Sequence, residues 1–229
     1  MKKEHFILLS GLLLLLIAGC KKDSPTTISN INFGYTYFPT KVGLIRIYQV
    51  DSIYWDDFNN KHDTVSYQLK EIIDSTYLDN QNRPTQRIAR YKLDSLGNWT
   101  IYKVWASNRT TTTAERVEDN IRFVKFIFPP KNNSKWNGNS ENTLDAQTYQ
   151  ITSLNISDNL SGLSFDSTMT VLQIDDNNLV SRMYGVEKYA TGVGLYYRQN
   201  INQLYIFPTP DIQSGYIYTE TLLSYSNLP

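Results

Sequence analysis

The 229-residue sequence has one cysteine, Cys20, and two histidines, His5 and His62. A single cysteine cannot form an intramolecular disulfide, a redox pair or a thiolate metal site. Zinc needs three or four nitrogen or sulfur ligands, and a Ser-His-Asp triad would have to use His62, although no serine lies in a G-x-S-x-G motif. We therefore predict no metal, no cofactor and no catalytic residue.

The chain also lacks an excess of either charge and a long hydrophobic run. It carries 22 Lys and Arg against 22 Asp and Glu, so it offers no basic surface for nucleic acid, and no nucleic-acid partner is expected. The longest apolar run, residues 6–19, contains Ser10 and spans fourteen residues. A membrane-crossing helix needs about 20 residues. A permanent transmembrane helix is therefore not predicted.

The apolar run has the layout of a secretory signal peptide, because Lys2 and Lys3 precede it. Its end, Leu16-Ile17-Ala18-Gly19-Cys20, resembles the lipobox of bacterial lipoproteins. This resemblance implies a diacylglyceryl thioether on Cys20, cleavage before that residue and acylation of the new amino group. The alternative is an ordinary cysteine that follows a signal peptide.

These features predict a lipoprotein signal peptide at 1–19, a lipidated cysteine with a flexible polar tether at 20–32, and a β-rich globular domain at 33–229. Each buried methylene contributes about 0.8 kcal/mol, so two or three acyl chains anchor a protein firmly. The predicted partner is thus a membrane, bound through N-terminal acyl chains. Lys21, in place of Asp after the cysteine, favours the outer membrane of the cell envelope, on either its periplasmic or its surface face.

The composition of the remaining chain favours β-structure. The sequence has 17 tyrosines, and its many Thr, Ile and Val residues suit a pleated surface. Asn, Asp and Gly clusters separate alternating segments. We predict a mainly β, single antiparallel domain whose curved sheet forms a sandwich or a partly closed barrel, with little helix. The expected strands are 44–50, 65–72, 87–93, 99–105, 121–128, 149–156, 168–174, 193–198, 203–207 and 216–225, and the only helical turns are expected within 113–120 and 178–184.

Two segments resemble parts of uncharacterised lipoproteins of the Bacteroidota. Residues 185–199, GVEKYATGVGLYYRQ, resemble a segment written E-x-Y-A-x-G-V-G-L-V-Y, and residues 37–52 resemble the start of the same domains but lack their tryptophan. The resemblance implies an envelope location and a β-rich fold. It does not indicate an activity. Gly192 and Gly194 by themselves predict a bend or bulge, because glycine readily adopts positive φ.

Two acidic pairs, Asp56-Asp57 and Asp175-Asp176, are the candidates for carboxylate chemistry. A glycosidase needs two carboxyl groups several Å apart. The alternative is that these residues cap turns through side-chain to backbone hydrogen bonds. Calcium is a third interpretation of the second pair, which lacks the glycine and distal glutamate of an EF-hand loop.

Trp99 and Trp105 are the candidates for glycan stacking. They are six residues apart, so on one straight strand they point to the same side. A glycan-binding module predicts an exposed aromatic row, whereas packing in the core is the alternative. A carrier of hydrophobic ligands instead predicts an apolar cavity inside the curved sheet.

A tripeptide of Asp, Ser or Thr, and an aliphatic residue or Thr occurs five times. It resembles the acceptor sequence of general protein O-glycosylation in Bacteroidota. The alternative is that Asp-Ser and Asp-Thr are favoured where turns become strands. The candidate hydroxyls belong to Ser52, Thr64, Ser75, Ser95 and Ser167.

Together these patterns predict a lipid-anchored envelope protein that acts without catalysis, as a binding or assembly component. Its partners beyond the membrane would be a glycan or envelope proteins. The alternatives are the glycan-binding module, the hydrophobic-ligand carrier and, as an outsider, a carboxylate-dependent glycosidase.

Overall fold

The computed structural model describes residues 32–59 and 61–227. The predicted signal peptide, Cys20 and the tether up to residue 31 lie outside the described residues. Among the residues described, no helix combines the length and apolar character needed to span a membrane.

The described chain consists of a 3-10 helix, η2, followed by twelve strands. Their alternating buried and exposed side chains follow the period of two expected for sheet residues. The elements are η2 Tyr35–Tyr37, β1 Leu44–Asp56, β2 Lys61–Leu78, β3 Pro84–Leu93, β4 Trp99–Arg109, β5 Thr113–Glu118, β6 Ile121–Ile127, β7 Lys135–Asn137, β8 Thr148–Leu160, β9 Leu163–Asn177, β10 Ser181–Ala190, β11 Gly194–Tyr205 and β12 Ile212–Asn227.

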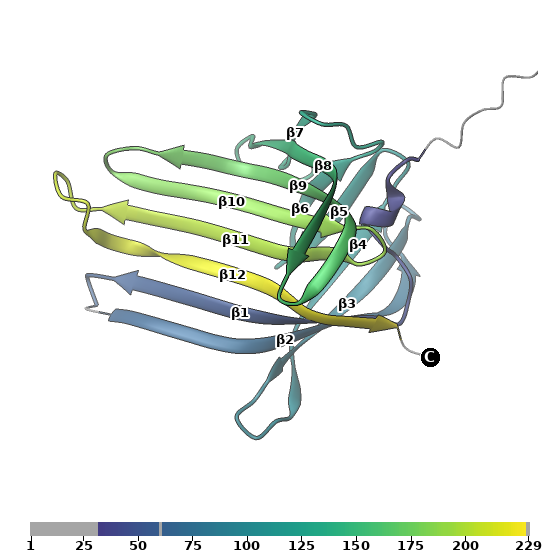
Figure 1. Ribbon diagram of the computed structural model, residues 1–229, viewed down its shortest axis with the longest axis horizontal. Coiled ribbons are helices and arrows are strands. Elements are labelled where there is room, and N and C mark those ends of the chain that lie inside the picture. Colours follow the sequence, from purple (N-terminus) through teal and green to yellow (C-terminus); the bar gives the residue numbers. More distant parts are fainter. Residues whose placement is uncertain (1–31, 60, 228–229) are drawn as a thin grey trace, which may run out of the picture. The chain divides into compact units, whose positions relative to one another are not determined.

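All twelve strands belong to one antiparallel sheet (Figure 1), in the order β6-β5-β4-β3-β2-β1-β12-β11-β10-β9-β8-β7. The first and last strands pair at its centre and join two six-stranded meanders. At the outer edges, the Val124 amide donates to the Gly138 carbonyl at 2.9 Å, and the Trp136 indole donates to the Val124 carbonyl at 2.8 Å. The sheet is therefore a nearly closed barrel, which confirms the predicted fold class.

Most expected strands are present, and the hairpin of β3 and β4 has the predicted turn, with Leu93 opposite Trp99. Three expectations are wrong. Residues 113–120 contain strand β5, because pairing with β4 and β6 overrides the helical propensity of its Ala, Glu and Arg residues. Residues 178–184 lead into β10, which shows no alternation because none of its residues is exposed on either face. Residues 203–207 contain the end of β11 instead of a separate strand.

The two segments that carry the lipoprotein resemblance lie against each other. The Gly192 amide donates to the Thr36 carbonyl at 2.8 Å. Gly192 and Gly194 form the turn into β11 at φ values of 76° and 85°. A Cβ added to Gly194 would lie 2.7 Å from Arg46 Nη1, which donates to the Val193 carbonyl at 3.2 Å. Glycine is thus required here to admit the arginine.

Aromatic residues close this end of the sheet. Phe126 packs edge-on against Phe38, Phe128 and Tyr189, with ring centroids 4.9 to 5.7 Å apart. The Tyr37 hydroxyl donates to Asn155 Oδ1 at 2.9 Å. These contacts bury the segment that enters β1 and fix it to strands from both meanders.

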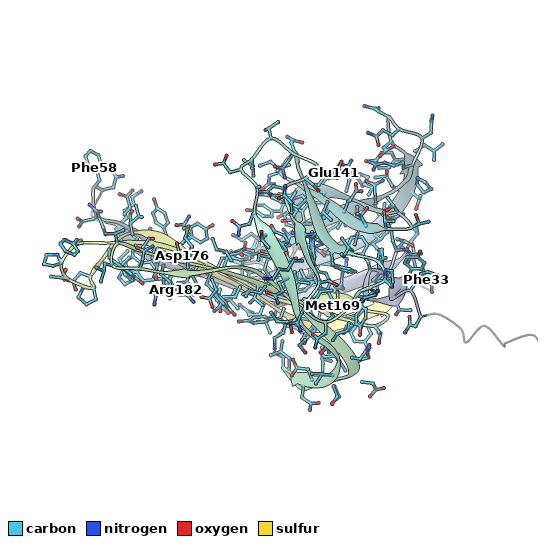
Figure 2. All side chains as sticks on the ribbon, turned by 90° about the horizontal axis from the view of Figure 1, so that it is seen from above. Phe33, Phe58, Glu141, Met169, Asp176 and Arg182 are labelled. Atoms are coloured by element: carbon cyan, nitrogen blue, oxygen red, sulfur yellow. The ribbon has the colours of Figure 1, made fainter. Side chains whose placement is uncertain are left out.

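The opposite end of the sheet is different. In Figure 2 the part that carries Asp176 and Arg182 extends as a thin layer beyond the part around the buried Met169. Its turns expose large apolar side chains, Phe58 at 97% and Leu179 at 78%. The core, and the polar site described next, therefore lie in the curved part of the sheet.

Candidate functional site

Charged side chains fill much of the interior of the curved sheet. Two rows of cross-strand neighbours alternate in sign. Glu187, Arg198 and Glu220 are directly opposite one another on β10, β11 and β12. The second row consists of Arg46, Glu71 and Arg90, which are directly opposite one another on β1, β2 and β3. Opposite charges at such positions attract, so each row supports the pairing of three strands.

Ion pairs also join the rows to each other and to the facing wall. Arg90 Nη2 lies 2.7 Å from Glu220 Oε1 and links the two rows. From β5 and β6, Glu118 lies 2.7 Å from Arg198, and Lys125 lies 3.0 Å from Glu187. We call these groups, together with Arg116, the ion cluster: Arg46, Glu71, Arg90, Arg116, Glu118, Lys125, Glu187, Arg198 and Glu220, of which all but Glu118 are buried.

A pocket of about 210 Å³ opens onto this cluster, and we call it the mouth pocket. Three cluster members, Arg90, Glu118 and Arg198, form part of its lining, so the pocket borders directly on the ion cluster. The remaining lining consists of the charged Lys103 and Asp119 and of four aromatic residues, Tyr67, Tyr102, Trp105 and Tyr218.

Trp105 is packed among the charged groups of the pocket. The Arg90 guanidinium lies 3.7 Å from the centre of its ring, and the Arg198 guanidinium lies 5.6 Å away. The indole donates to Asp119 Oδ1 at 3.3 Å. Trp105 is 6% exposed, so it serves mainly as a rigid wall that orients the two arginines.

The exposed row of Trp99 and Trp105 that a glycan-binding module would need is not formed. Lys103 pairs with Arg90 and Ile101 with Tyr91, so Tyr102 is an extra residue on β4. Such a bulge reverses the phase of the strand, and the two tryptophans lie on opposite faces. Trp99 is half-buried, and Lys70 Nζ lies 4.6 Å from the centre of its ring. The same bulge places Tyr102, which is 47% exposed, at the mouth pocket.

The acids of the pocket are ionised at neutral pH. Burial would raise the pKa of Glu118, but Arg198 and Lys125 outweigh burial and hold the pKa well below its ordinary value. The hydrogen bond from Lys103 lowers the pKa of Asp119. Burial raises the pKa of Tyr67 to about 12. The pocket therefore presents carboxylates as acceptors and phenols and guanidiniums as donors.

The predicted acidic pairs lie away from the mouth pocket. Asp56 Oδ1 accepts a hydrogen bond from the Asn59 amide at 3.1 Å, which is the turn-capping alternative. Asp175 pairs with Arg182 at 2.6 Å. His62 stacks on Trp55 with ring centroids 5.3 Å apart. In residues 32–59 and 61–227, no group of three or more His, Cys, Asp or Glu side chains is arranged to hold a metal ion.

The hydroxyls predicted to carry O-glycans differ in accessibility. Those of Thr64, Ser75 and Ser95 are on exposed residues, whereas Ser52 is half-buried. Ser167 Oγ lies 2.7 Å from the hydroxyl of the buried Tyr37 and is engaged in the core of the fold. O-glycosylation stays a prediction, for which Thr64, Ser75 and Ser95 are the exposed positions.

The ion cluster and the mouth pocket were missed by the sequence analysis. A signal was present, because Arg46 alternates in phase with the apolar Leu44 and Tyr48, and Glu71 with Leu69 and Ile73. A charged residue in the inward phase of a strand marks a buried charge. Lys125 and Glu220 carry the same mark, but the sequence does not show which charges meet, because the partners come from strands far apart in the chain.

No protein-family model matches the chain, and no curated protein matches it. Two solved structures are similar to this chain. Each is 10% identical to it in sequence, and each match covers 83% of this chain and 98% of the solved chain. One is described as a "putative lipoprotein" from Parabacteroides distasonis, with a TM-score of 0.40. The other is a "putative exported protein with YmcC-like fold" from Bacteroides fragilis, with a TM-score of 0.44.

Proposed function

We propose that this protein is a lipid-anchored component of the bacterial cell envelope that binds a small saccharide unit in the mouth pocket, without catalysis. The observation that carries the proposal is the lining of that pocket. Aromatic rings stand beside planar charged groups that ion pairs already hold in place. Sugar rings pack on aromatic faces through their C–H groups, while their hydroxyls need both donors and acceptors.

The size and rigidity of the pocket support a small ligand. Its volume of about 210 Å³ lies below the roughly 300–1,000 Å³ of pockets for drug-sized molecules. Arg90 and Arg198 each contact two carboxylates within 3 Å, so little side-chain ordering is needed on binding.

The lowered pKa values support binding without catalysis. Glycoside hydrolysis needs one carboxyl group that stays protonated near neutral pH and acts as the acid. Both carboxyl groups of the mouth pocket, Glu118 and Asp119, have lowered pKa values. Neither can serve as that acid.

The interior does not favour a carrier of hydrophobic ligands. Within the described residues, the space inside the sheet is occupied by the ion cluster and by aromatic side chains such as Tyr48, Phe126 and Tyr196, all under 2% exposed. Binding an apolar molecule there would require burying charged groups against it, which is costly.

The anchor is tested by metabolic labelling with a fatty-acid analogue. The wild-type chain should incorporate the label and sediment with envelope membranes, because Cys20 is the only sulfur that can receive a lipid. The Cys20→Ala variant should lose the label and run as a larger precursor on gels. Equal labelling of both chains would contradict the anchor and leave the binding proposal standing.

The binding site is tested by a glycan array followed by calorimetry with the tightest ligand. Replacement of Tyr102 by Ala should weaken binding about ten-fold, which corresponds to ~1.4 kcal/mol, because the ring that covers the sugar is lost. Tyr77 is also 47% exposed but does not line the pocket, so Tyr77→Ala is the matched control and should bind as the wild type does. A chain that binds no glycan, or two variants of equal affinity, would contradict the proposed site.

A further inference from the structure

The ion cluster contains five cationic groups and four carboxylates. Four of the cations have a carboxylate oxygen within 3.2 Å: Arg46, Arg90, Lys125 and Arg198. Arg116 is 3% exposed, and its contact with Glu71 is 4.0 Å long. Glu71 already pairs with Arg46 and Arg90. One positive charge is therefore left without its own counter-charge in a site of low dielectric.

A second observation concerns the hydrogen-bond donors of the arginines beside the mouth pocket. Arg198 lines the mouth pocket and is 5% exposed, yet its Nε has no hydrogen-bond partner. Buried donors in folded proteins nearly always have a partner, so this arginine of the pocket lining has donor capacity that the protein itself does not use. Arg116 Nε is a second buried donor without a partner, two residues along β5 from Glu118 of the pocket.

We infer that the ligand of the mouth pocket is an acidic saccharide, a sugar unit that carries one carboxylate. This inference rests on the proposed function and adds the charge of the ligand. The carboxylate accepts from the Arg198 side and balances the surplus charge of the cluster, while the ring packs against Tyr102. A charge-assisted hydrogen bond is roughly twice as strong as a neutral one, so the acid is preferred over its neutral counterpart.

The experiment compares sugars that differ only at carbon 6. Calorimetry with the purified chain, residues 20–229, measures the affinity for galacturonate against galactose and for glucuronate against glucose, at low and at high sodium chloride concentration. Acetate serves as the simple anion. We expect the better of the two acids to bind about ten-fold tighter than its neutral partner at low salt, and the preference to shrink as salt screens the charge.

A variant tests the source of the preference. Arg116 does not line the pocket, and Met has a similar length without charge. In Arg116→Met the preference for the acid should fall to less than three-fold, because the cluster is then neutral. Lys131→Met removes one charge from an exposed position and is the matched control, which should keep the wild-type preference.

Each outcome bears on a different statement. If acid and neutral sugars bind equally well, the inference is overturned and the proposed function stands. If no sugar binds, or if acetate binds as tightly as the acids, both are overturned. If Arg116→Met does not fold, the ratio of the two affinities in the wild-type chain and its salt dependence decide the inference alone.

Discussion

Replacement of Glu71 by Gln is expected to lower the free energy of unfolding by about 3–5 kcal/mol. Glu71 is fully buried and lies 3.2 Å from Arg46, 2.9 Å from Arg90 and 4.0 Å from Arg116. The amide keeps the shape of the side chain but removes its charge. Arg90 would keep its pair with Glu220, whereas Arg46 and Arg116 would lose their contact with a carboxylate, and nothing would offset the cost of burying their charge.

Urea unfolding, followed by tyrosine and tryptophan fluorescence, measures this loss. Asp74→Asn is the matched control, because Asp74 pairs with Arg87 where both side chains are partly exposed. Exposed ion pairs contribute about 0–1 kcal/mol, so this variant should unfold close to the wild type. A Glu71→Gln protein as stable as Asp74→Asn would show that the ion cluster adds nothing to the fold.

Stability should also fall steeply in acid. Burial would raise the pKa of Glu71 and Glu187, but the cationic neighbours outweigh it: Arg90 and Arg116 hold the pKa of Glu71 below its ordinary 4.5, and Lys125 and Arg198 lower that of Glu187 to about 2. A carboxyl group whose pKa is lowered by folding stabilises the folded state above its ordinary pKa. That contribution disappears as the pH falls through the lowered value.

The expected profile is a plateau in the free energy of unfolding between pH 7 and about pH 5, and a progressive loss between about pH 4.5 and 2. Urea unfolding at half-unit steps of pH gives the profile. The Asp74→Asn variant should follow the wild type throughout, since it leaves the ion cluster intact. A plateau that continues unchanged to pH 3 would mean that folding does not lower the pKa of the buried glutamates.

The fold was largely predictable from local patterns, and the failures have two causes. Alternation and Asn-rich turns mark β1 to β4 because those strands are long, although β2 and β4 each contain a bulge. In β10 no residue is exposed on either face, so no alternation of polar and apolar residues marks the strand. Propensity misled at β5, where good helix formers are held in a strand by pairing on both sides.

The site was predictable only in part. The inward phase of Arg46 and Glu71 can be read from the sequence, whereas the contact of Glu118 with Arg198 joins residues 80 positions apart. The position of Tyr102 depends on one extra residue in β4, which no periodicity reveals. Closure of the sheet, and not any local motif, creates the pocket.

The place of β12 between β1 and β11 determines when the sheet can be completed. Residues 212–227 are synthesised after the other eleven strands, yet they fill the centre of the sheet. Until they arrive, β1 and β11 each have one long side of unpaired amides and carbonyls, which is the kind of surface that promotes aggregation. Assembly of the two halves therefore has to wait for β12, and a chaperone that shields β1 and β11 would act before residue 212 emerges.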